Sequence, residues 1–384
     1  MIALGMMSGT SLDGIDCALV ELEAKGERLQ LEVRDARTVA FDETTSALLD
    51  DIVRRGSGDI AAVARLHRAL GLAHADAAES FLGGRGVDFA AMHGLTIFHD
   101  GGAALTLQIG DPFAVRERIA ASVCFDFRSA DCALGGSGAP LVPYVDALVL
   151  ADPLEKRVAL NCGGIANVTL LAAGARPEHE NIVAFDTGPG NMLLDAWVLE
   201  ASEGRAAFDD NGEGAARGRA DAKLLASMLE DPYFAMAPPK STGRERFGEP
   251  FVRRFREELR ALSLDDALAT LLALTVESIA MALELHRFAD ARVLCSGGGA
   301  RNRAFLRALG RRLSRARVET SDAVGMPVDA KEAIAFAVLG YETLRERSAN
   351  LPSVTGARKR TVLGAIAPHE LPALLAKIAK ETAP

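Results

Sequence analysis

Short apolar stretches separated by small or polar turns run through the first forty residues, a pattern typical of β-strands. Residues 2–8 and 15–22 are two such stretches, and residues 29–40 are a third candidate strand. A helix-like segment comes next. The beginning of the chain therefore predicts the order β-turn-β-turn-β-α.

The same order recurs in the second half of the chain. Strands are expected at Val158–Asn161, Ala166–Leu171 and Asn181–Phe185, and Cys162-Gly163-Gly164-Ile165 forms the turn between the first two. A helix is expected to start near Asn191. The sequence thus contains one plan twice.

Later elements also correspond between the halves. They are a strand at Val87–His93, a helix at Pro112–Ala120 and a strand at Ser122–Phe127, then a strand at Ala291–Ser296 and helices at Asn302–Leu313 and Asp329–Arg345. Mixed sheets with helices on both faces predict two α/β domains around a cleft, with ligands at strand ends. We expect lobes at residues 1–134 and 135–384, joined near Asp126–Pro143, with room for the extreme C-terminus to pack back on the first lobe.

Composition narrows the class of protein. The 384 residues are enough for two cores, and 49% hydrophobic with 25% charged residues is typical of a globular protein. A net charge of −9 disfavours a general nucleic-acid binder. The five cysteines form no C-x-x-C pair, so free thiols are expected. The longest apolar helix-like run, Ala267–Val276, is too short for a bilayer, and no signal peptide precedes the first strand, so we expect a cytoplasmic protein without membrane or nucleic-acid partners.

The turn after the first strand is the first candidate site. Gly9, Thr10 and Ser11 are small or hydroxyl-bearing, and Asp13 and Asp16 follow. Successive N–H groups and hydroxyls in such a turn can form an anion-binding nest. Since a strand follows, the turn differs from the strand–loop–helix of a P-loop. An ordinary hairpin turn is the alternative.

Two glycine-rich loops in the second half are further candidates. Asp186–Asn191 follows an apolar strand and precedes a helix, so Asp186 is expected at a strand end facing the cleft, beside free N–H groups of the helix. A helix cap with a turn is the alternative. Ser296–Asn302 also joins a strand to a helix, and its three glycines allow close approach of a ring or a phosphate.

Other polar clusters also follow predicted strands. Arg128 is a candidate partner for an anion, since its guanidinium can bind a carboxylate with two hydrogen bonds. Pro238–Glu245 is either a solvated loop or a substrate lid, and Glu332 is either a first-turn acid or a side chain facing the cleft. The remaining polar groups of these clusters are His93, Thr96, His99, Gln108, Asp126 and Asp131.

Together these motifs resemble the anhydro-N-acetylmuramic acid kinases, bacterial enzymes of cell-wall recycling. The resemblance is collinear from Gly5 to about Gly340. Its marks are G-M-M-S-G-T-S-L-D-G-I-D at 5–16, Q-I-G-D-P at 108–112, D-F-R-x-x-D at 126–131, G-A-P-L-V-P at 138–143, N-C-G-G-I-A-N at 161–167, F-D-T-G-P-G-N at 185–191, P-P-K-S-T-G-R-E at 238–245, G-G-G-A-R-N at 297–302 and E-A-I-A-F-A at 332–337. The resemblance implies duplicated ribonuclease-H-like domains of the actin and sugar-kinase type, flanking a nucleotide cleft.

In such a family, ATP and Mg²⁺ bind in the cleft, water opens the 1,6-anhydro ring, and O6 takes the γ-phosphoryl group to give N-acetylmuramic acid 6-phosphate. The resemblance implies Asp186 as the base, with Glu332 and Arg128 beside the reaction. The implied nucleotide-binding residues are Gly9, Thr10, Ser11, Leu12, Asp13, Gly14, Ile15, Asp16, Gly163, Gly164, Gly188, Gly297, Gly298 and Asn302. The implied sugar-binding residues are His93, Thr96, Gln108, Asp126 and Pro140, and the implied Mg²⁺ residues are Asp13 and Asp16, directly or through water.

One position departs from the family. The family motif His-Gly-Gln-Thr has Leu95 in place of the glutamine here, which affects the expected fit of the sugar. A kinase for another sugar is therefore one alternative, and an actin-like or chaperone-like ATPase is a second. A homodimer is left open, because the sequence does not fix the oligomeric state.

Overall fold

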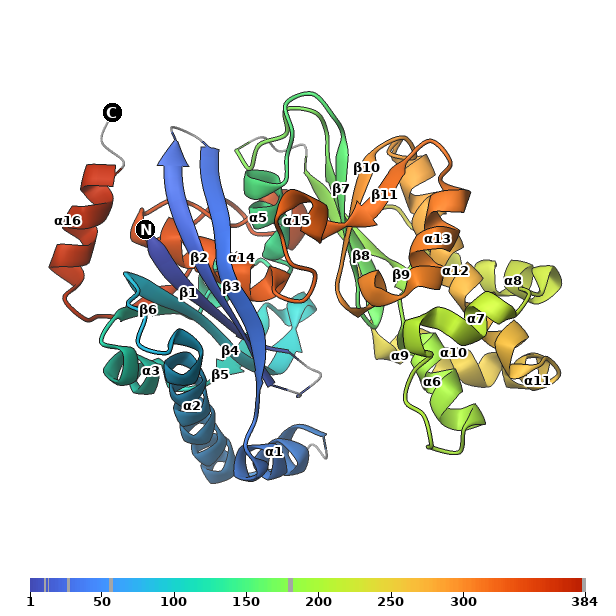
Figure 1. The fold of residues 1–384 in the computed structure, drawn as a ribbon, viewed down its shortest axis with the longest axis horizontal. Helices are drawn as coiled ribbons and strands as arrows, with labels where there is room; N and C mark the ends of the chain where they lie inside the picture. The colour runs from blue at the N-terminus through green and yellow to red at the C-terminus, as the bar shows by residue number, and fades with distance from the viewer. Residues whose placement is uncertain (10–11, 13, 26–27, 55–57, 179–181, 382–384) are drawn as a thin grey trace. The chain divides into compact units, whose positions relative to one another are not determined.

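The computed structural model describes residues 1–9, 12, 14–25, 28–54, 58–178 and 182–381. The chain forms two compact units (Figure 1). The first unit contains Met1–Val149 and Gly325–Pro384, and the second contains Leu150–Val324. In the colours of Figure 1 the first unit runs from blue to teal and returns in red, while the second is green to orange.

The first unit is built on a mixed sheet. Its strands lie in the order β12-β6-β4-β1-β2-β3, and β5 pairs with β4. Strands β1, β2 and β3 are antiparallel neighbours, whereas β4 is parallel to both β1 and β6. The strands are β1 (Ile2–Ser8), β2 (Gly14–Lys25), β3 (Arg28–Ala40), β4 (Phe89–Asp100), β5 (Leu105–Ile109), β6 (Ser122–Phe125) and β12 (Ala365–Ala367). The helices are α1 (Glu43–Leu49), α2 (Ile60–Leu82), α3 (Pro112–Ile119), α4 (Ser129–Ala133), α5 (Val142–Val149), α14 (Lys331–Leu344), α15 (Pro352–Thr355) and α16 (Leu371–Glu381).

The second unit repeats this plan. Its strand order is β11-β10-β7-β8-β9, with β7, β8 and β9 antiparallel and β10 parallel to β7 and β11. The strands are β7 (Arg157–Cys162), β8 (Ile165–Leu171), β9 (Val183–Pro189), β10 (Arg292–Ser296) and β11 (Arg317–Thr320). The helices are α6 (Met192–Ala201), α7 (Glu213–Arg217), α8 (Ala222–Leu229), α9 (Arg244–Phe247), α10 (Glu249–Arg254), α11 (Arg256–Arg260), α12 (Leu264–Leu285) and α13 (Arg303–Arg312). The order 3-2-1-4-6 in one sheet matches 9-8-7-10-11 in the other, so the predicted duplicated α/β fold is confirmed.

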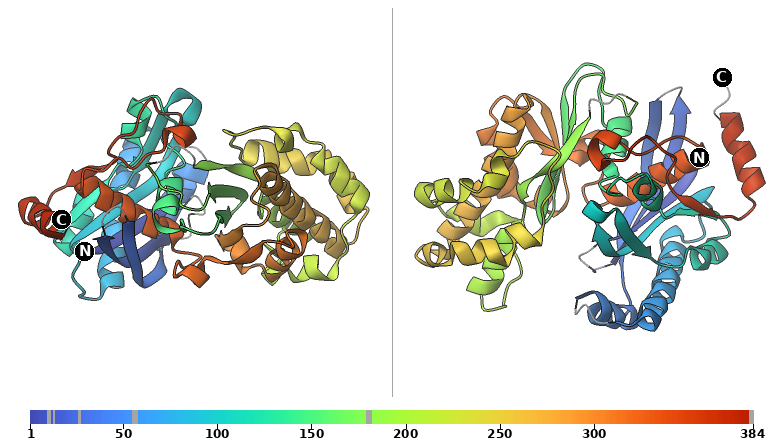
Figure 2. Two further views of the ribbon diagram at one scale, coloured as in Figure 1. Left: turned by 90° about the horizontal axis from the view of Figure 1, so that it is seen from above. Right: turned by 180° about the vertical axis from the view of Figure 1, so that it is seen from behind.

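Both faces of the first sheet are covered, because successive residues of a strand point to opposite faces. Leu4 and Met6 of β1 pack in one core with residues of α2 and α3. Gly5 between them lies against α14, where an added Cβ would come within 1.9 Å of the Ala333 oxygen. The views in Figure 2 show α2 and α3 together on one side of this sheet. Helix α14 therefore lies directly on the strands that lead to the first candidate site.

The expected boundary at residues 134 and 135 differs from this division into units. Helix α5 packs on α14 through two buried contacts, one between Tyr144 Oη and Glu342 Oε2 at 2.7 Å and one between Lys331 Nζ and Asp146 Oδ1 at 2.9 Å. These contacts hold α5 in the first unit. The C-terminal part is also tied there, since Lys377 of α16 pairs with Asp88 at 2.5 Å.

Helix α12 is longer than the apolar run seen in the sequence. Among the described helices it alone is long and apolar enough to cross a membrane, but 72% of its most apolar 18-residue window is buried. It packs against β9, α6, α7, α8 and α13. Its composition is therefore that of a core helix.

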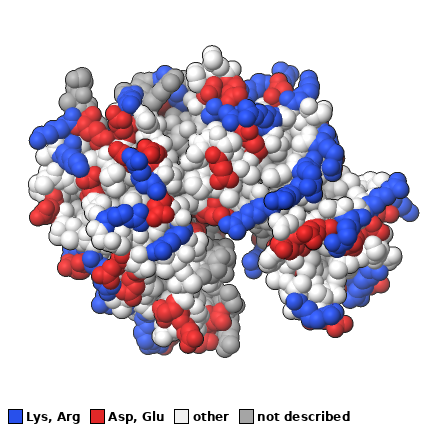
Figure 3. Space-filling model, viewed as in Figure 1, with Lys and Arg blue, Asp and Glu red and all other residues white. Residues whose placement is uncertain are grey.

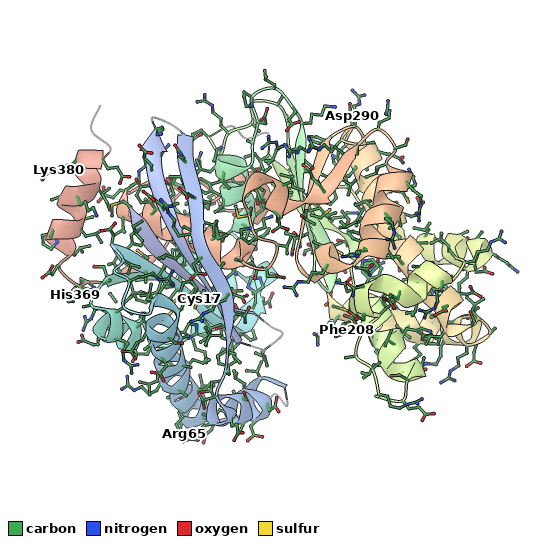
Figure 4. All side chains as sticks on the ribbon, viewed as in Figure 1. Cys17, Arg65, Phe208, Asp290, His369 and Lys380 are labelled. Atoms are coloured by element: carbon green, nitrogen blue, oxygen red, sulfur yellow. The ribbon has the colours of Figure 1, made fainter. Side chains whose placement is uncertain are left out.

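The five cysteines are free, as predicted. Four are buried, including Cys17 on β2, which is labelled in Figure 4, and Cys132 is half-buried. On the face drawn in Figure 3, acidic and basic side chains are interspersed.

Candidate active site

Arg128 and His93 form the centre of the site in the first unit. Arg128 lies at the start of α4, and its Nε donates to His93 Nε2 at 3.0 Å while Nη1 donates to the Gly138 oxygen at 2.8 Å. His93 Nδ1 lies 2.9 Å from the Gly94 oxygen. Since Nε2 accepts from Arg128, this pattern assigns the ring proton to Nδ1.

The histidine ring is therefore neutral. Burial is the main reason that its pKa lies well below the usual value, and the charge of Arg128 lowers it further. The ring also packs on Phe336 of α14, with centroids 4.5 Å apart. With both nitrogens engaged, His93 is placed to orient Arg128 rather than to exchange a proton.

Two carboxylates lie near this arginine. Glu332 is in the first turn of α14 and keeps solvent-accessible surface, yet the surrounding protein removes enough hydration to raise its pKa. Arg128 opposes this shift, and Asp16 of β2 adds to it by like-charge repulsion. Asp16 accepts a hydrogen bond from Thr38 Oγ1 at 2.6 Å. The structure thus brings Asp16, Arg128 and Glu332 together from three distant parts of the sequence.

The other predicted sugar-binding residues comprise one hydrogen-bonded pair and two residues with separate surroundings. Thr96 and Gln108 face one another across β4 and β5, and Gln108 Nε2 donates to Thr96 Oγ1 at 3.1 Å. Asp126 Oδ1 accepts from the Ser129 N–H at 3.3 Å and from Ser129 Oγ at 2.6 Å. Pro140 follows the Gly138 segment that Arg128 binds. Only the Gly138–Pro140 segment is thereby linked directly to Arg128.

Leu95 is fully buried in an apolar cluster with Leu12, Leu66, Leu70 and Ile109. A glutamine at this position would bury a polar amide group among apolar side chains. The departure from the family motif therefore alters packing next to the first turn.

Only part of the predicted phosphate turn lies within the described residues. Thr10, Ser11 and Asp13 lie outside them. Leu12 has a φ of 58°, and its N–H donates to the Gly9 oxygen at 3.2 Å. The side chains of Leu12 and Ile15 are buried in apolar cores, so these two residues can offer a nucleotide only main-chain groups.

Asp186 is the centre of the site in the second unit. Strand β9 continues to Pro189, so the expectation that Asp186 lies at a strand end is wrong. The pairing of β8 with β9 extends past Asp186, because Ala166 and Ile165 still face Gly188 and Pro189. Asp186 instead lies within β9, the edge strand of its sheet.

One segment of the chain, Tyr233–Thr242, binds Asp186 at the free edge of β9. The Asp186 N–H donates to the Lys240 oxygen at 3.3 Å, and Tyr233 Oη donates to the Asp186 oxygen at 2.8 Å. The Thr242 N–H donates to Asp186 Oδ2 at 2.9 Å. Asp186 Oδ1 has no hydrogen-bond partner among the described residues. One carboxylate oxygen is thus fixed and the other is available.

This carboxylate has an unusual acidity. The pKa of Asp186 is raised to about 6, mainly by burial and also by repulsion from Glu245. The Thr242 N–H and the charge of Lys240 act in the opposite direction. A carboxylate with such a pKa suits proton abstraction near neutral pH.

The turn at Gly163 and Gly164 accepts hydrogen bonds from main-chain N–H groups at the start of α6. Its carbonyl oxygens accept from the N–H groups of Gly190 at 2.8 Å, Asn191 at 2.8 Å and Met192 at 3.2 Å. The expectation that these N–H groups at the start of α6 are free for an anion is therefore wrong. They hold the turn in place.

The remaining predicted nucleotide residues differ in how much room they leave. Gly188 packs closely on Phe234, and the Asn302 side chain caps α13 by accepting from the Phe305 N–H at 2.9 Å. Gly297 has a φ of 75°. Gly298 is more open, since a Cβ there would meet only Asn191 Nδ2, at 3.7 Å. Gly298 is thus the position of this loop that leaves space for a ligand.

The described residues contain no group of three or more His, Cys, Asp or Glu side chains arranged for a metal ion. Mg²⁺ in phosphotransfer sites is usually held by one or two carboxylates together with phosphates and water. Asp16 and Glu332 lie near enough for repulsion between their charges to raise the pKa of Glu332. Their oxygens are donors of the type that Mg²⁺ takes.

Residues 1–369 match the family model described as anhydro-N-acetylmuramic acid kinase. The chain belongs to the anhydro-N-acetylmuramic acid kinase family. It is an enzyme family of phosphotransferases, and the sugar-kinase expectation from the motifs is confirmed.

Curated relatives carry the same name. An anhydro-N-acetylmuramic acid kinase of Streptomyces coelicolor is 40% identical, covering 99% of this chain and 97% of its own. One of Xanthomonas axonopodis pv. citri is 43% identical, covering 95% and 97%. Among solved structures, the activator of 2-hydroxyisocaproyl-CoA dehydratase from Clostridium difficile matches with a TM-score of 0.40 at 12% identity, covering 90% of this chain and 98% of its own. A ROK family glucokinase from Streptomyces griseus matches with a TM-score of 0.35 at 13% identity, covering 88% and 98%.

Some partners in the site were missed from the sequence. Tyr233, Lys240 and Thr242 bind Asp186, whereas the sequence predicts the segment 238–245 to be a solvated loop or a substrate lid. The available signal was that this segment is one of the motifs that resemble the family. No sequence pattern linked it to Asp186.

Proposed function

We propose that this kinase hydrates and phosphorylates 1,6-anhydro-N-acetylmuramic acid with ATP and Mg²⁺, and that Asp186 is the general base. The observation that carries the assignment is the carboxylate with one fixed and one available oxygen and a pKa of about 6. A base of that acidity is ionised at neutral pH and can still accept a proton.

The proposed reaction has two parts, the attack of water on the anomeric carbon and the transfer of the phosphoryl group to O6. Asp186 takes a proton from water as the water oxygen bonds to the anomeric carbon. The bond from that carbon to O6 breaks, and O6 forms a bond to the γ-phosphorus as ADP leaves. Asp186 later returns its proton to solvent, so the base is restored. Inverting glycosidases use a carboxylate base in the same way.

Arg128 is proposed to bind an anion at this reaction. Its Nε and Nη1 are engaged within the protein, and Nη2 has no partner in the described part of the chain. An arginine held by two bonds offers a pre-oriented donor. The lactyl carboxylate of the sugar and the reacting centre are both suitable partners, and Glu332 is proposed to help hold the water.

The nucleotide is proposed to bind at the Gly9–Asp16 turn with its phosphates and near Gly297–Asn302 with its adenosine. The open space around the Cα of Gly298 supports this placement of the adenosine. Asp16 would hold Mg²⁺, directly or through water, with Asp13 as a second candidate from the sequence. When bound, Mg²⁺ neutralises charge that develops on the transferred phosphoryl group.

The test is to incubate the protein with ATP–Mg²⁺ and a panel of sugars in ¹⁸O-labelled water. ADP together with a 6-phosphate labelled at the anomeric oxygen is expected only from 1,6-anhydro-N-acetylmuramic acid. A phosphate formed from another sugar, without incorporation of ¹⁸O, would replace the proposed substrate. ADP formed equally without any sugar would favour the ATPase alternative.

A further inference from the structure

Asp131 is a fully buried carboxylate, 0% exposed, one turn of helix after Arg128. None of the roles described above uses it. A buried carboxylate is costly unless hydrogen bonds satisfy its oxygens. In the described part of the chain Asp131 makes no salt bridge with Lys or Arg, so neutral donors must satisfy it.

Three donors converge on this carboxylate. Oδ1 accepts from Asn350 Nδ2 at 2.7 Å and from Thr355 Oγ1 at 2.8 Å, and Oδ2 accepts from the Gly138 N–H at 2.9 Å. Asn350 is also buried, and its own Oδ1 accepts from the Thr361 N–H at 2.7 Å. The carboxylate therefore joins the C-terminal segment 350–361 to the loop that carries Gly138.

The same loop holds the arginine. The Gly138 peptide donates its N–H to Asp131, and the oxygen of Gly138 accepts from Arg128 Nη1 at 2.8 Å. Main-chain bonds reinforce this link, since the Ser137 N–H donates to the Thr355 oxygen at 2.8 Å. A shift of Asp131 would thus move the acceptor that fixes one arm of Arg128.

We propose that Asp131 is a positioning residue for Arg128, and that Asn350 and Thr355 complete the network that holds the Gly138 acceptor in place. This inference rests on the anion-binding role proposed for Arg128. It extends the sugar site to residues 350–361, which lie more than two hundred positions along the chain from Arg128.

A double-mutant cycle tests the inference. Asp131→Asn replaces an acceptor by an amide whose NH₂ would face donors, so we expect kcat/KM for the sugar to fall about 10- to 100-fold, the range for a hydrogen bond to a charged group. In the Arg128→Met background the same change should have almost no further effect on kcat/KM, because nothing is left to position. The KM for ATP should stay near its normal value.

Two further variants keep the test decisive. If Asp131→Asn does not fold, Thr355→Val removes one donor and enters the same cycle with a smaller expected loss. Thr343→Val is the matched control, because the Thr343 hydroxyl is buried in the same unit but bonds only to main-chain oxygens. Its effect on kcat/KM should be small and equal in both backgrounds.

The two possible failures are distinguishable. Equal losses from Asp131→Asn in the presence and absence of Arg128 would overturn the positioning role while leaving Arg128 in the site. An Arg128→Met enzyme with normal kcat/KM for the sugar would instead remove the proposed role of Arg128, and the inference with it.

Discussion

The two candidate sites are held in opposite ways. In the second unit, Asp186 has one carboxylate oxygen fixed by a single N–H and the other without a partner among the described residues. In the first unit, Arg128 donates hydrogen bonds to His93 and Gly138. The Gly138 N–H in turn donates to the buried carboxylate of Asp131. Asp186 thus keeps one carboxylate oxygen without a partner among the described residues, whereas Arg128 is held at both Nε and Nη1.

The difference suits the role proposed for each group. A base has to exchange a proton, so complete hydrogen bonding of its ionised form would lower its pKa and reduce its basicity. A charged arginine has to keep its charge and its direction, so more bonds only fix it better. The comparison thus separates a group that changes state from one that does not.

The largest expected effect comes from removing the base. Asp186→Asn should lower kcat by about 100-fold or more, the usual contribution of a general base. The Kd for ATP should change little, because Asp186 is not proposed to contact the nucleotide. Steady-state kinetics and calorimetric titration with ATP would measure the two quantities. An Asp186→Asn enzyme of near-normal kcat would contradict the assignment.

The second largest effect is expected in the dependence of kcat/KM on pH. Because the pKa of Asp186 is raised to about 6, the carboxylate is protonated below that pH and cannot act as a base. We expect kcat/KM to fall about tenfold per pH unit on the acid side. Lys240 lowers the pKa of Asp186, so Lys240→Met should move this acid limb to higher pH. A limb that stays in place in Lys240→Met, or survives in Asp186→Asn, would show that another group titrates.

A smaller effect is expected on the arginine side. His93→Phe keeps a ring against Phe336 but removes the acceptor for Arg128 Nε. The KM for the sugar should rise about tenfold, as for loss of one hydrogen bond to a charged group, and the KM for ATP should not change. Since His93 is neutral, the acid limb should stay where it is. A shifted limb would mean that His93 itself exchanges a proton.

The smallest effect on catalysis is expected at Leu95. Leu95→Gln would bury an amide among apolar side chains, at a cost of about 1–3 kcal/mol in the free energy of unfolding. Thermal denaturation should show a lower Tm, while the KM for the sugar stays within about twofold, the scatter of a remote change. Leu95→Met, which keeps an apolar side chain, is the control. A lower KM for the sugar in Leu95→Gln would show that this position does contact the substrate.

The sequence alone determined the element order and selected the candidate site residues. Apolar stretches of strand length and glycine-rich turns repeat along the chain, and the two sheets have the matching strand orders that this repeat predicts. The sequence motifs that resemble the family identified Asp186, Arg128 and Glu332 as candidates. Such local patterns are readable because strand and turn preferences depend on near neighbours.

Only the tertiary structure decided which side chains meet. Asp186 lies within β9 rather than at its end, because the pairing with β8 continues to Pro189. The start of α6 is occupied by the Gly163 turn, and Asp131 is satisfied by Asn350 and Thr355 from the far end of the chain. These contacts join residues distant in sequence, so no local pattern could predict them. The Asp186 oxygen that lacks a partner in the described part of the chain and the fixed direction of Arg128 are consequences of that packing.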